Sequence, residues 1–243
     1  MRRESFARRF VWLLAAATAF AAWVFLHLPA TDAVEWLLPR IGLAAYDRLW
    51  LGTAVALGIG AITFITWRER WTATPPVRAA FLLLVVVATA QALLLVAPIE
   101  YVHYPQYALV SFLLACGGLP LEIAWMVATA SGAADELHQR ITMMRGTPDY
   151  FDWNDLVLNG TGAAFGLVLL AAGSRVRRTL TFTRRTMLVM LGVATAVAAI
   201  AAPPVLVPYL TETPRHTWFR IASPLEAMLL LGLVWGSVRR LAA

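Results

Sequence analysis

Charged residues are scarce in this 243-residue sequence, and lysine is absent from it. Only 14% of the residues are charged and 60% are hydrophobic, which excludes a disordered chain. All 20 basic residues are Arg, and most stand between apolar runs, so the formal net charge of +6 indicates membrane topology rather than nucleic-acid binding. The one cysteine, Cys116, excludes an intrachain disulfide, and its place in an apolar run indicates a packing residue.

Motifs of cofactor-dependent and hydrolytic enzymes are also missing. The sequence has no phosphate-binding Gly loop, no dinucleotide fingerprint and no haem or iron–sulfur ligand pattern. Ser131 is not part of a G-x-S-x-G motif, so we expect it to pack against another helix. A metal site built from His103, Asp135, Glu136 and Asp155 would lack any H-x-x-x-H, H-E-x-x-H or two-cysteine spacing. The sequence therefore predicts neither a metal nor a cofactor.

Apolar runs bounded by charge or proline dominate the chain, and the mean hydropathy is +0.69. A hydrocarbon core about 30 Å thick requires about 20 apolar residues per helix. We therefore predict an all-α, polytopic transmembrane helical bundle of about eight spans. The predicted spans are Phe10–Leu28, Leu49–Trp67, Ala79–Ala97, Tyr104–Gly118, Leu121–Gln139, Asp155–Gly173, Thr186–Ala202 and Pro224–Val238.

The distribution of charge over the connections predicts the orientation of the spans. With eight spans, 14 of the 20 Arg fall on one side, and 11 of the 14 acidic residues fall on the other. Because cytoplasmic loops retain positive charge, we expect both termini in the cytoplasm and a location in the bacterial cytoplasmic membrane. The longest polar loops, 29–48, 140–154 and 203–223, then lie outside the cell.

Ionisable residues in or beside the spans are the candidate functional groups, because each is costly to place in hydrocarbon. Most belong to two regions on the predicted outer side, 99–107 and 135–159. Helical spacing puts Asp135 and Gln139 on one helix face, and Glu136 beside Arg140, where we expect a surface ion pair. We expect His138 to be exposed.

The start of the sixth predicted span has features of its own. Asp152 can cap this helix, since an aspartate accepts the unpaired backbone N–H groups of the first turn. Asp155, Asn159 and Gly162 follow one stripe of the helix. Gly162 and Gly166 stand four residues apart, which permits close approach of a neighbouring helix and would bring Asn159 against its partners.

The order of these polar residues resembles that of the VanZ-like family, named for a protein associated with resistance to the glycopeptide teicoplanin. The resemblance rests on the run Asp135 to Gln139, then Arg145, then Asp155 with Asn159 and Gly162 after it, and on His103 and Tyr107 upstream. It covers roughly 79–173. Glu100 departs from the pattern, because family members often carry a basic residue there. The resemblance thus divides the chain into two N-terminal helices (1–78), a VanZ-like four-helix core (79–173) and two C-terminal helices (174–243).

The polar residues predict a small pocket at the outer leaflet that binds membrane lipid, a lipid-linked envelope precursor or a peptide, and the resemblance places this pocket in the context of the cell envelope. In this hypothesis Arg145 clamps an anionic phosphate or carboxylate in a bidentate manner. An alternative hypothesis is an intramembrane hydrolase or transferase with His103 or a carboxylate as base. A third is a structural or assembly protein in which the polar groups only hold helices together. The candidate catalytic residues are His103, Asp135 and Glu136, and the candidate substrate-binding residues are Tyr107, Gln139, Arg145, Asp155 and Asn159.

Overall fold

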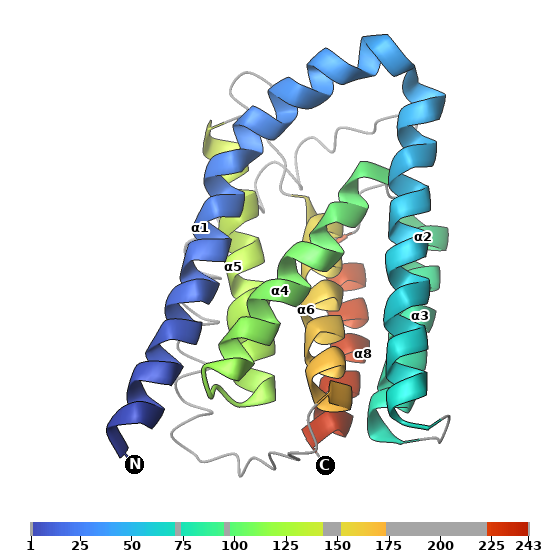
Figure 1. The fold of residues 1–243 in the computed structure, drawn as a ribbon. Coiled ribbons are helices and arrows are strands. Elements are labelled where there is room, and N and C mark those ends of the chain that lie inside the picture. The colour runs from blue at the N-terminus through green and yellow to red at the C-terminus, as the bar shows by residue number, and fades with distance from the viewer. Residues whose placement is uncertain (1, 71–73, 95–97, 143–151, 174–222, 243) are drawn as a thin grey trace.

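The computed structural model describes residues 2–70, 74–94, 98–142, 152–173 and 223–242 (Figure 1). Within these residues every regular element is helical, as the all-α prediction requires. The elements are α1 (Arg2–Ile41), α2 (Leu43–Arg68), α3 (Pro75–Leu94), the 3-10 helix η1 (Pro98–Val102), α4 (His103–Cys116), α5 (Leu121–Thr142), α6 (Trp153–Gly173) and α8 (Pro224–Ala242).

Three of the described helices are long and apolar enough to cross a membrane. They are Phe6–Ile41 of α1, with 36 residues, α2, with 26, and α6, with 21. The predicted count of eight spans is therefore not supported by the described residues, and the seventh predicted span, Thr186–Ala202, lies outside them. The difference has physical causes, because α4 has only 14 residues and α5 carries four buried ionisable side chains.

The predicted loop 29–48 is wrong, because α1 continues to Ile41 and α2 begins at Leu43. Its charged residues made the segment look like a loop, but Asp32 and Glu35 are exposed side chains of a continuing helix. Two prolines are accommodated inside α1, and the break falls at Gly42, whose φ of 77° is the left-handed region that glycine tolerates.

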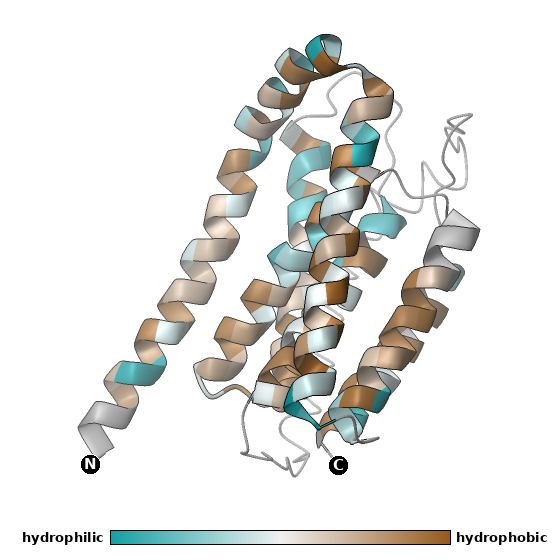
Figure 2. Ribbon diagram, turned by 45° about the vertical axis from the view of Figure 1, so that its right-hand side comes forward, coloured by the Kyte–Doolittle hydropathy of each residue, from teal (hydrophilic) through white to brown (hydrophobic). Residues whose placement is uncertain are grey.

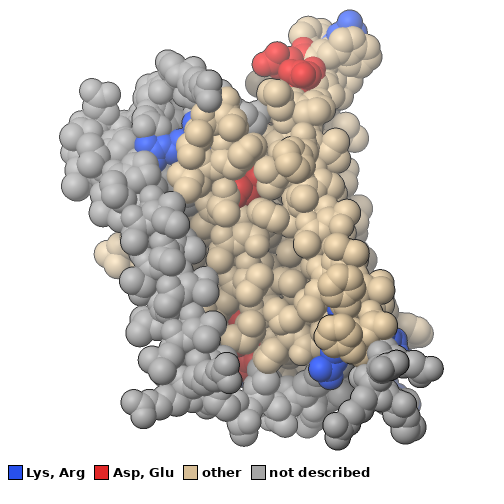
Figure 3. Space-filling view, turned by 90° about the vertical axis from the view of Figure 1, so that its left-hand side faces the viewer, with Lys and Arg blue, Asp and Glu red and all other residues tan. Residues whose placement is uncertain are grey.

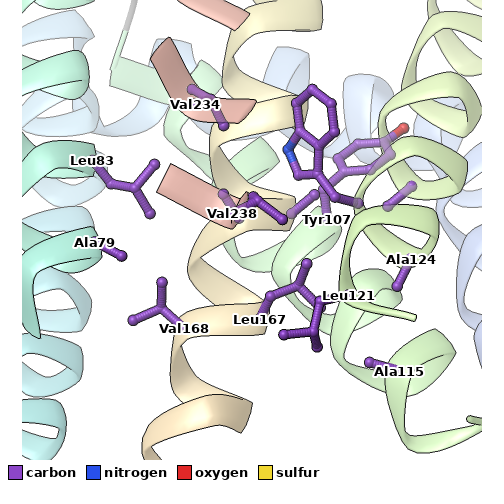
Figure 4. Close-up of a cluster of buried hydrophobic side chains, with 14 of the residues drawn as sticks. Ala79, Leu83, Tyr107, Ala115, Leu121, Ala124, Leu167, Val168, Val234 and Val238 are labelled. Atoms are coloured by element: carbon purple, nitrogen blue, oxygen red, sulfur yellow. The ribbon is translucent and has the colours of Figure 1, made fainter. Parts of the chain in front are cut away.

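The bundle is centred on α6, the most buried of the three long helices. Within its most apolar window 67% of the residues are buried, against 6% for α1 and 11% for α2. Helices α3, α4, α5 and α8 pack against α6, and α1 packs against α4. Figure 4 shows the apolar core that results, with Leu83 from α3, Val168 from α6, Val234 from α8 and Tyr107 from α4.

The outer helices expose large apolar side chains. Phe6 and Phe25 of α1 are 73% and 76% exposed, and Leu43 and Ile59 of α2 are each 63% exposed. The most hydrophilic residues of α1 lie near its two ends (Figure 2), and charged side chains occupy little of the described surface in Figure 3. Such a surface suits contact with lipid rather than with water.

The helices place three chain segments at one end of the bundle. Figure 1 shows the beginnings of α4 and α6 and the end of α5 at the end opposite to the start of α1 and the end of α8. The reversal from α4 to α5 occurs at the predicted turn Gly117-Gly118-Leu119-Pro120, since α4 ends at Cys116 and α5 begins at Leu121. Gly118 has a φ of 93°, which favours glycine at this turn.

Candidate functional site

A group of buried polar side chains gathers where α4 and α6 begin and α5 ends. We call it the polar cluster. None of its members is more than 9% exposed, although the surrounding helices are predominantly apolar. Burial of so many ionisable groups is costly unless they are paired or bound to something else. The polar cluster comprises His103, Tyr107, Asp135, Glu136, Asp152, Asp155 and Asn159.

Two side chains in the first turns of α4 reach across to the neighbouring helices. Nε2 of His103 lies 3.4 Å from Oδ1 of Asp155 on α6. The hydroxyl of Tyr107 donates to Oδ2 of Asp135 on α5, at 3.2 Å. The two rings stack with their centroids 6.4 Å apart. One helix start therefore binds an acidic residue on each of its two neighbours.

Glu136 and Asp152 join the end of α5 to the beginning of α6. Oε1 of Glu136 accepts a hydrogen bond from the backbone N–H of Asp152, at 3.1 Å. Oδ1 of Asp152 in turn accepts from the backbone N–H of Asn154, at 2.8 Å. This bond confirms the predicted helix cap, because it satisfies an N–H group that has no partner within the helix.

Close backbone contact between α4 and α6 depends on two glycines. A Cβ atom at Gly162 would lie 2.6 Å from the carbonyl oxygen of Tyr104, and one at Gly166 would lie 2.5 Å from the hydroxyl oxygen of Ser111. The prediction of close approach at this pair is thus confirmed. It places the first turns of α4 directly against α6, as the contact between His103 and Asp155 requires.

A third glycine makes room for Asn159. A Cβ atom at Gly132 of α5 would lie 2.6 Å from Nδ2 of Asn159 and 2.8 Å from its Cβ. Asn159 is 1% exposed, so its amide is held between α5 and α6. The residues that sequence spacing placed on one stripe of α6 do face the neighbouring helices.

Several residues of α5 and the segment after it differ from their predicted positions. Glu136 and Arg140 are 6% and 7% exposed, so the predicted surface pair is wrong: both side chains are buried among helices. His138 was expected to be exposed but is half-buried. Gln139 is also half-buried and is less enclosed than Asp135, and Arg145 lies outside the described residues.

Sequence reasoning missed three polar residues near the polar cluster. The hydroxyl of Ser111 donates to the carbonyl oxygen of Ala163 at 2.7 Å, which joins α4 to α6. Its spacing of four residues from Tyr107 was the available signal. Asn154 is completely buried at the start of α6. His27 of α1 is half-buried and lies close enough to Asp135 and His103 for electrostatic interaction. The only sequence signal for it was an ionisable side chain within an apolar run.

The polar cluster is rich in carboxyl groups. Burial, and next the charge of Asp155, raise the pKa of Asp152 from 3.8 to about 7. Asp152 also interacts electrostatically with Glu136 of α5 and with His103 of α4. Within the part of the chain that the structure describes, no three His, Cys, Asp or Glu side chains are arranged to hold a metal ion.

The raised pKa of Asp152 predicts a pH-dependent stability. The folded protein binds this proton more tightly than the unfolded chain, so its contribution is complete below about pH 4 and is lost as pH rises to about 7. At about 1.4 kcal/mol per pKa unit, the loss is up to about 4 kcal/mol. We expect the unfolding midpoint to fall over this range, as measured by thermal unfolding in detergent.

Asp152→Asn keeps an acceptor for the helix cap but removes the titration. Its unfolding midpoint should therefore fall less between pH 4 and 7 than that of the unmodified protein. Asp32→Asn is the matched control, because Asp32 is exposed on α1. Parallel pH profiles for the unmodified protein and Asp152→Asn would contradict the prediction.

Comparison of the chain with known protein families, with curated proteins and with solved structures found no match. The resemblance to the VanZ-like family therefore rests on the motif residues alone. The structure brings His103, Tyr107, Asp135, Asp155 and Asn159 of that motif together at one end of the bundle. Their roles in binding or catalysis stay predictions.

Proposed function

We propose that the chain is a VanZ-like, multi-pass protein of the bacterial cytoplasmic membrane that binds the headgroup of a membrane lipid or a lipid-linked envelope precursor. In this proposal the chain crosses the membrane several times, both termini lie in the cytoplasm, and the polar cluster lies near the outer surface. The Arg distribution supports this orientation. So does the start of α1 at the same end of the bundle as the end of α8 (Figure 1).

One observation carries the binding proposal. Among the described residues, four buried atoms of the polar cluster have no hydrogen-bond partner: Nδ1 of His103 and the Oδ1 atoms of Asp135, Asp155 and Asn159. A buried polar atom without a partner costs about 1–3 kcal/mol, so four of them in one cluster are unfavourable if they serve only to hold helices together. A polar headgroup would satisfy them. Arg145, outside the described residues, keeps its proposed role as an anion clamp.

A second candidate function is an intramembrane hydrolase or transferase acting on a lipid-linked substrate. The pair of His103 and Asp155 favours it, since a carboxylate that holds Nε2 of an imidazole orients the ring and stabilises its protonated form. Nδ1 of His103 would then be the general base. Tyr107 fixes the ring by stacking against it.

The binding proposal predicts a loss of cellular function without a loss of protein. In bacteria whose teicoplanin susceptibility depends on the chain, Asp135→Asn or Asn159→Ala should abolish the effect while membrane abundance stays normal. The matched control is Glu122→Gln, because Glu122 is 4% exposed near the opposite end of α5. It should retain the effect. Full activity of both variants would contradict the proposal.

Abundance and turnover separate the other two candidates. If the polar cluster serves only packing, Asn159→Ala should lower abundance or the unfolding temperature and change nothing else. If the chain is an enzyme, the purified protein should convert a labelled lipid-linked envelope precursor, and His103→Gln should abolish the conversion. Binding of the precursor without turnover favours the first proposal.

A further inference from the structure

Of the four buried atoms without partners, Oδ1 of Asp155 faces Nε2 of His103. The other three have one property in common: each is a hydrogen-bond acceptor. Oδ1 of Asp135 and Oδ1 of Asn159 are a carboxylate and an amide oxygen. Nδ1 of His103 is an acceptor in the tautomer whose Nε2 carries the proton, and Nε2 faces the acidic Oδ1 of Asp155 at 3.4 Å. A group that satisfies all three must therefore supply several donors.

Contacts among the side chains place these acceptors in one neighbourhood. Tyr107 links two of them, because its ring stacks against His103 and its hydroxyl donates to Asp135. The side chain of Asn159 is a neighbour of His103. It also lies against Gly132, which precedes Asp135 on α5 by about one helical turn. The three acceptors thus come from α4, α5 and α6 and lie in one buried neighbourhood.

The formal charges around this centre favour a cation over an anion. Four buried carboxyl groups, Asp135, Glu136, Asp152 and Asp155, belong to the polar cluster, and they outnumber the buried basic side chains at this end of the bundle, His103 and Arg140. A buried carboxylate is stabilised by a cation that also donates hydrogen bonds to it. An anionic group at the same place would meet repulsion from the carboxylates.

We infer that the polar cluster binds a primary ammonium group, with its three N–H donors directed to His103, Asp135 and Asn159. This inference rests on the proposed headgroup binding and specifies its chemical class. A lipid headgroup such as ethanolamine phosphate carries this group, and so does a free amine. A quaternary ammonium has the same charge but no N–H donor, so it satisfies none of the three acceptors.

Burial of the polar cluster determines how the ligand is to be sought. The three acceptor residues are at most 5% exposed, so an ammonium group bound there exchanges slowly and is carried through purification. The full chain should therefore be purified in mild detergent and its bound lipid identified by native mass spectrometry. The same protein is then placed in nanodiscs that contain phosphatidylethanolamine, phosphatidylcholine or phosphatidylglycerol.

The expected result is retention of phosphatidylethanolamine about tenfold or more above phosphatidylcholine, the difference expected from loss of one charge-assisted hydrogen bond. The unfolding temperature should also be highest in phosphatidylethanolamine. Asp135→Asn should remove this preference, and Glu122→Gln should keep it. Free ethanolamine added to phosphatidylcholine nanodiscs separates the two sources: stabilisation there equal to that in phosphatidylethanolamine assigns the site to a soluble amine.

Two other outcomes overturn the inference, and they differ in what they leave standing. Retention of phosphatidylglycerol in preference to the ethanolamine lipid, lost in Asn159→Ala, would overturn the ammonium assignment and leave headgroup binding intact. No preference among the three lipids and no effect of free ethanolamine would overturn both proposals. The comparison of lipids with the unmodified protein decides this even if Asp135→Asn fails to fold.

Discussion

Replacing Gly166 with Ala is expected to destabilise the bundle by about 3 kcal/mol, because the packed helices leave no space for the added methyl group. Its Cβ would collide with the carbonyl oxygen of Ala108, a backbone atom that cannot rotate away, and would lie 2.5 Å from the hydroxyl oxygen of Ser111. The two helices would have to separate, which also weakens the hydrogen bond from Ser111 to Ala163. Thermal or detergent-induced unfolding measures the loss.

Gly232→Ala is the control for this prediction. Gly232 lies inside α8, and a Cβ atom there would meet no other atom within 4 Å. Alanine is more favourable than glycine in a helix interior by about 1 kcal/mol, so this variant should be as stable as the unmodified protein or slightly more so. Equal stability of the two alanine variants would show that α4 and α6 are not in backbone contact.

A comparable loss, about 3 kcal/mol, is expected for Trp125→Ala. Trp125 of α5 is 8% exposed, and its ring lies 5.2 Å from that of Trp235 on α8. Its Nε1–H donates to the carbonyl oxygen of Gly160 on α6, at 2.7 Å. Truncation therefore leaves a cavity among three helices and removes a hydrogen bond between two of them.

Trp125→Phe separates these two contributions, because phenylalanine keeps most of the ring but lacks the donor. We expect it to lose about 1 kcal/mol, the usual net value of one hydrogen bond. Trp67→Ala is the control, since Trp67 is 65% exposed on α2. A loss for Trp67→Ala as large as that for Trp125→Ala would contradict the assigned packing. The measurement is unfolding in the same detergent.

Local signals in the sequence predicted much of the central bundle. The turn at Gly117 and Gly118 was predicted from residues that end a helix, and the cap at Asp152 from a side chain that starts one. These features depend on a few neighbouring residues. The end of α1 depends on more than its neighbours, because prolines and exposed acids occur both in loops and on the surface of a continuing helix.

The members of the polar cluster could be predicted, but their surroundings could not. Polar residues at helical spacing in an apolar chain stand out, and His103, Asp135, Asp155 and Asn159 were found in this way. Whether Glu136 and Arg140 face water or another helix depends on how α5 packs, which no local pattern contains. Ser111 escaped notice for the same reason, since its acceptor at Ala163 is distant in sequence.

The length of α1 limits how it can lie in a bilayer. Its 36-residue apolar segment is about 54 Å long, whereas the hydrocarbon core is about 30 Å thick. Tilt within the usual range of about 0–40° does not remove this excess, so one part of the helix must leave the hydrocarbon. The exposed acids Asp32 and Glu35 and the stacked pair of Arg40 and Trp36 identify that part as the C-terminal third. This part lies at the same end of the bundle as the beginnings of α4 and α6 (Figure 1).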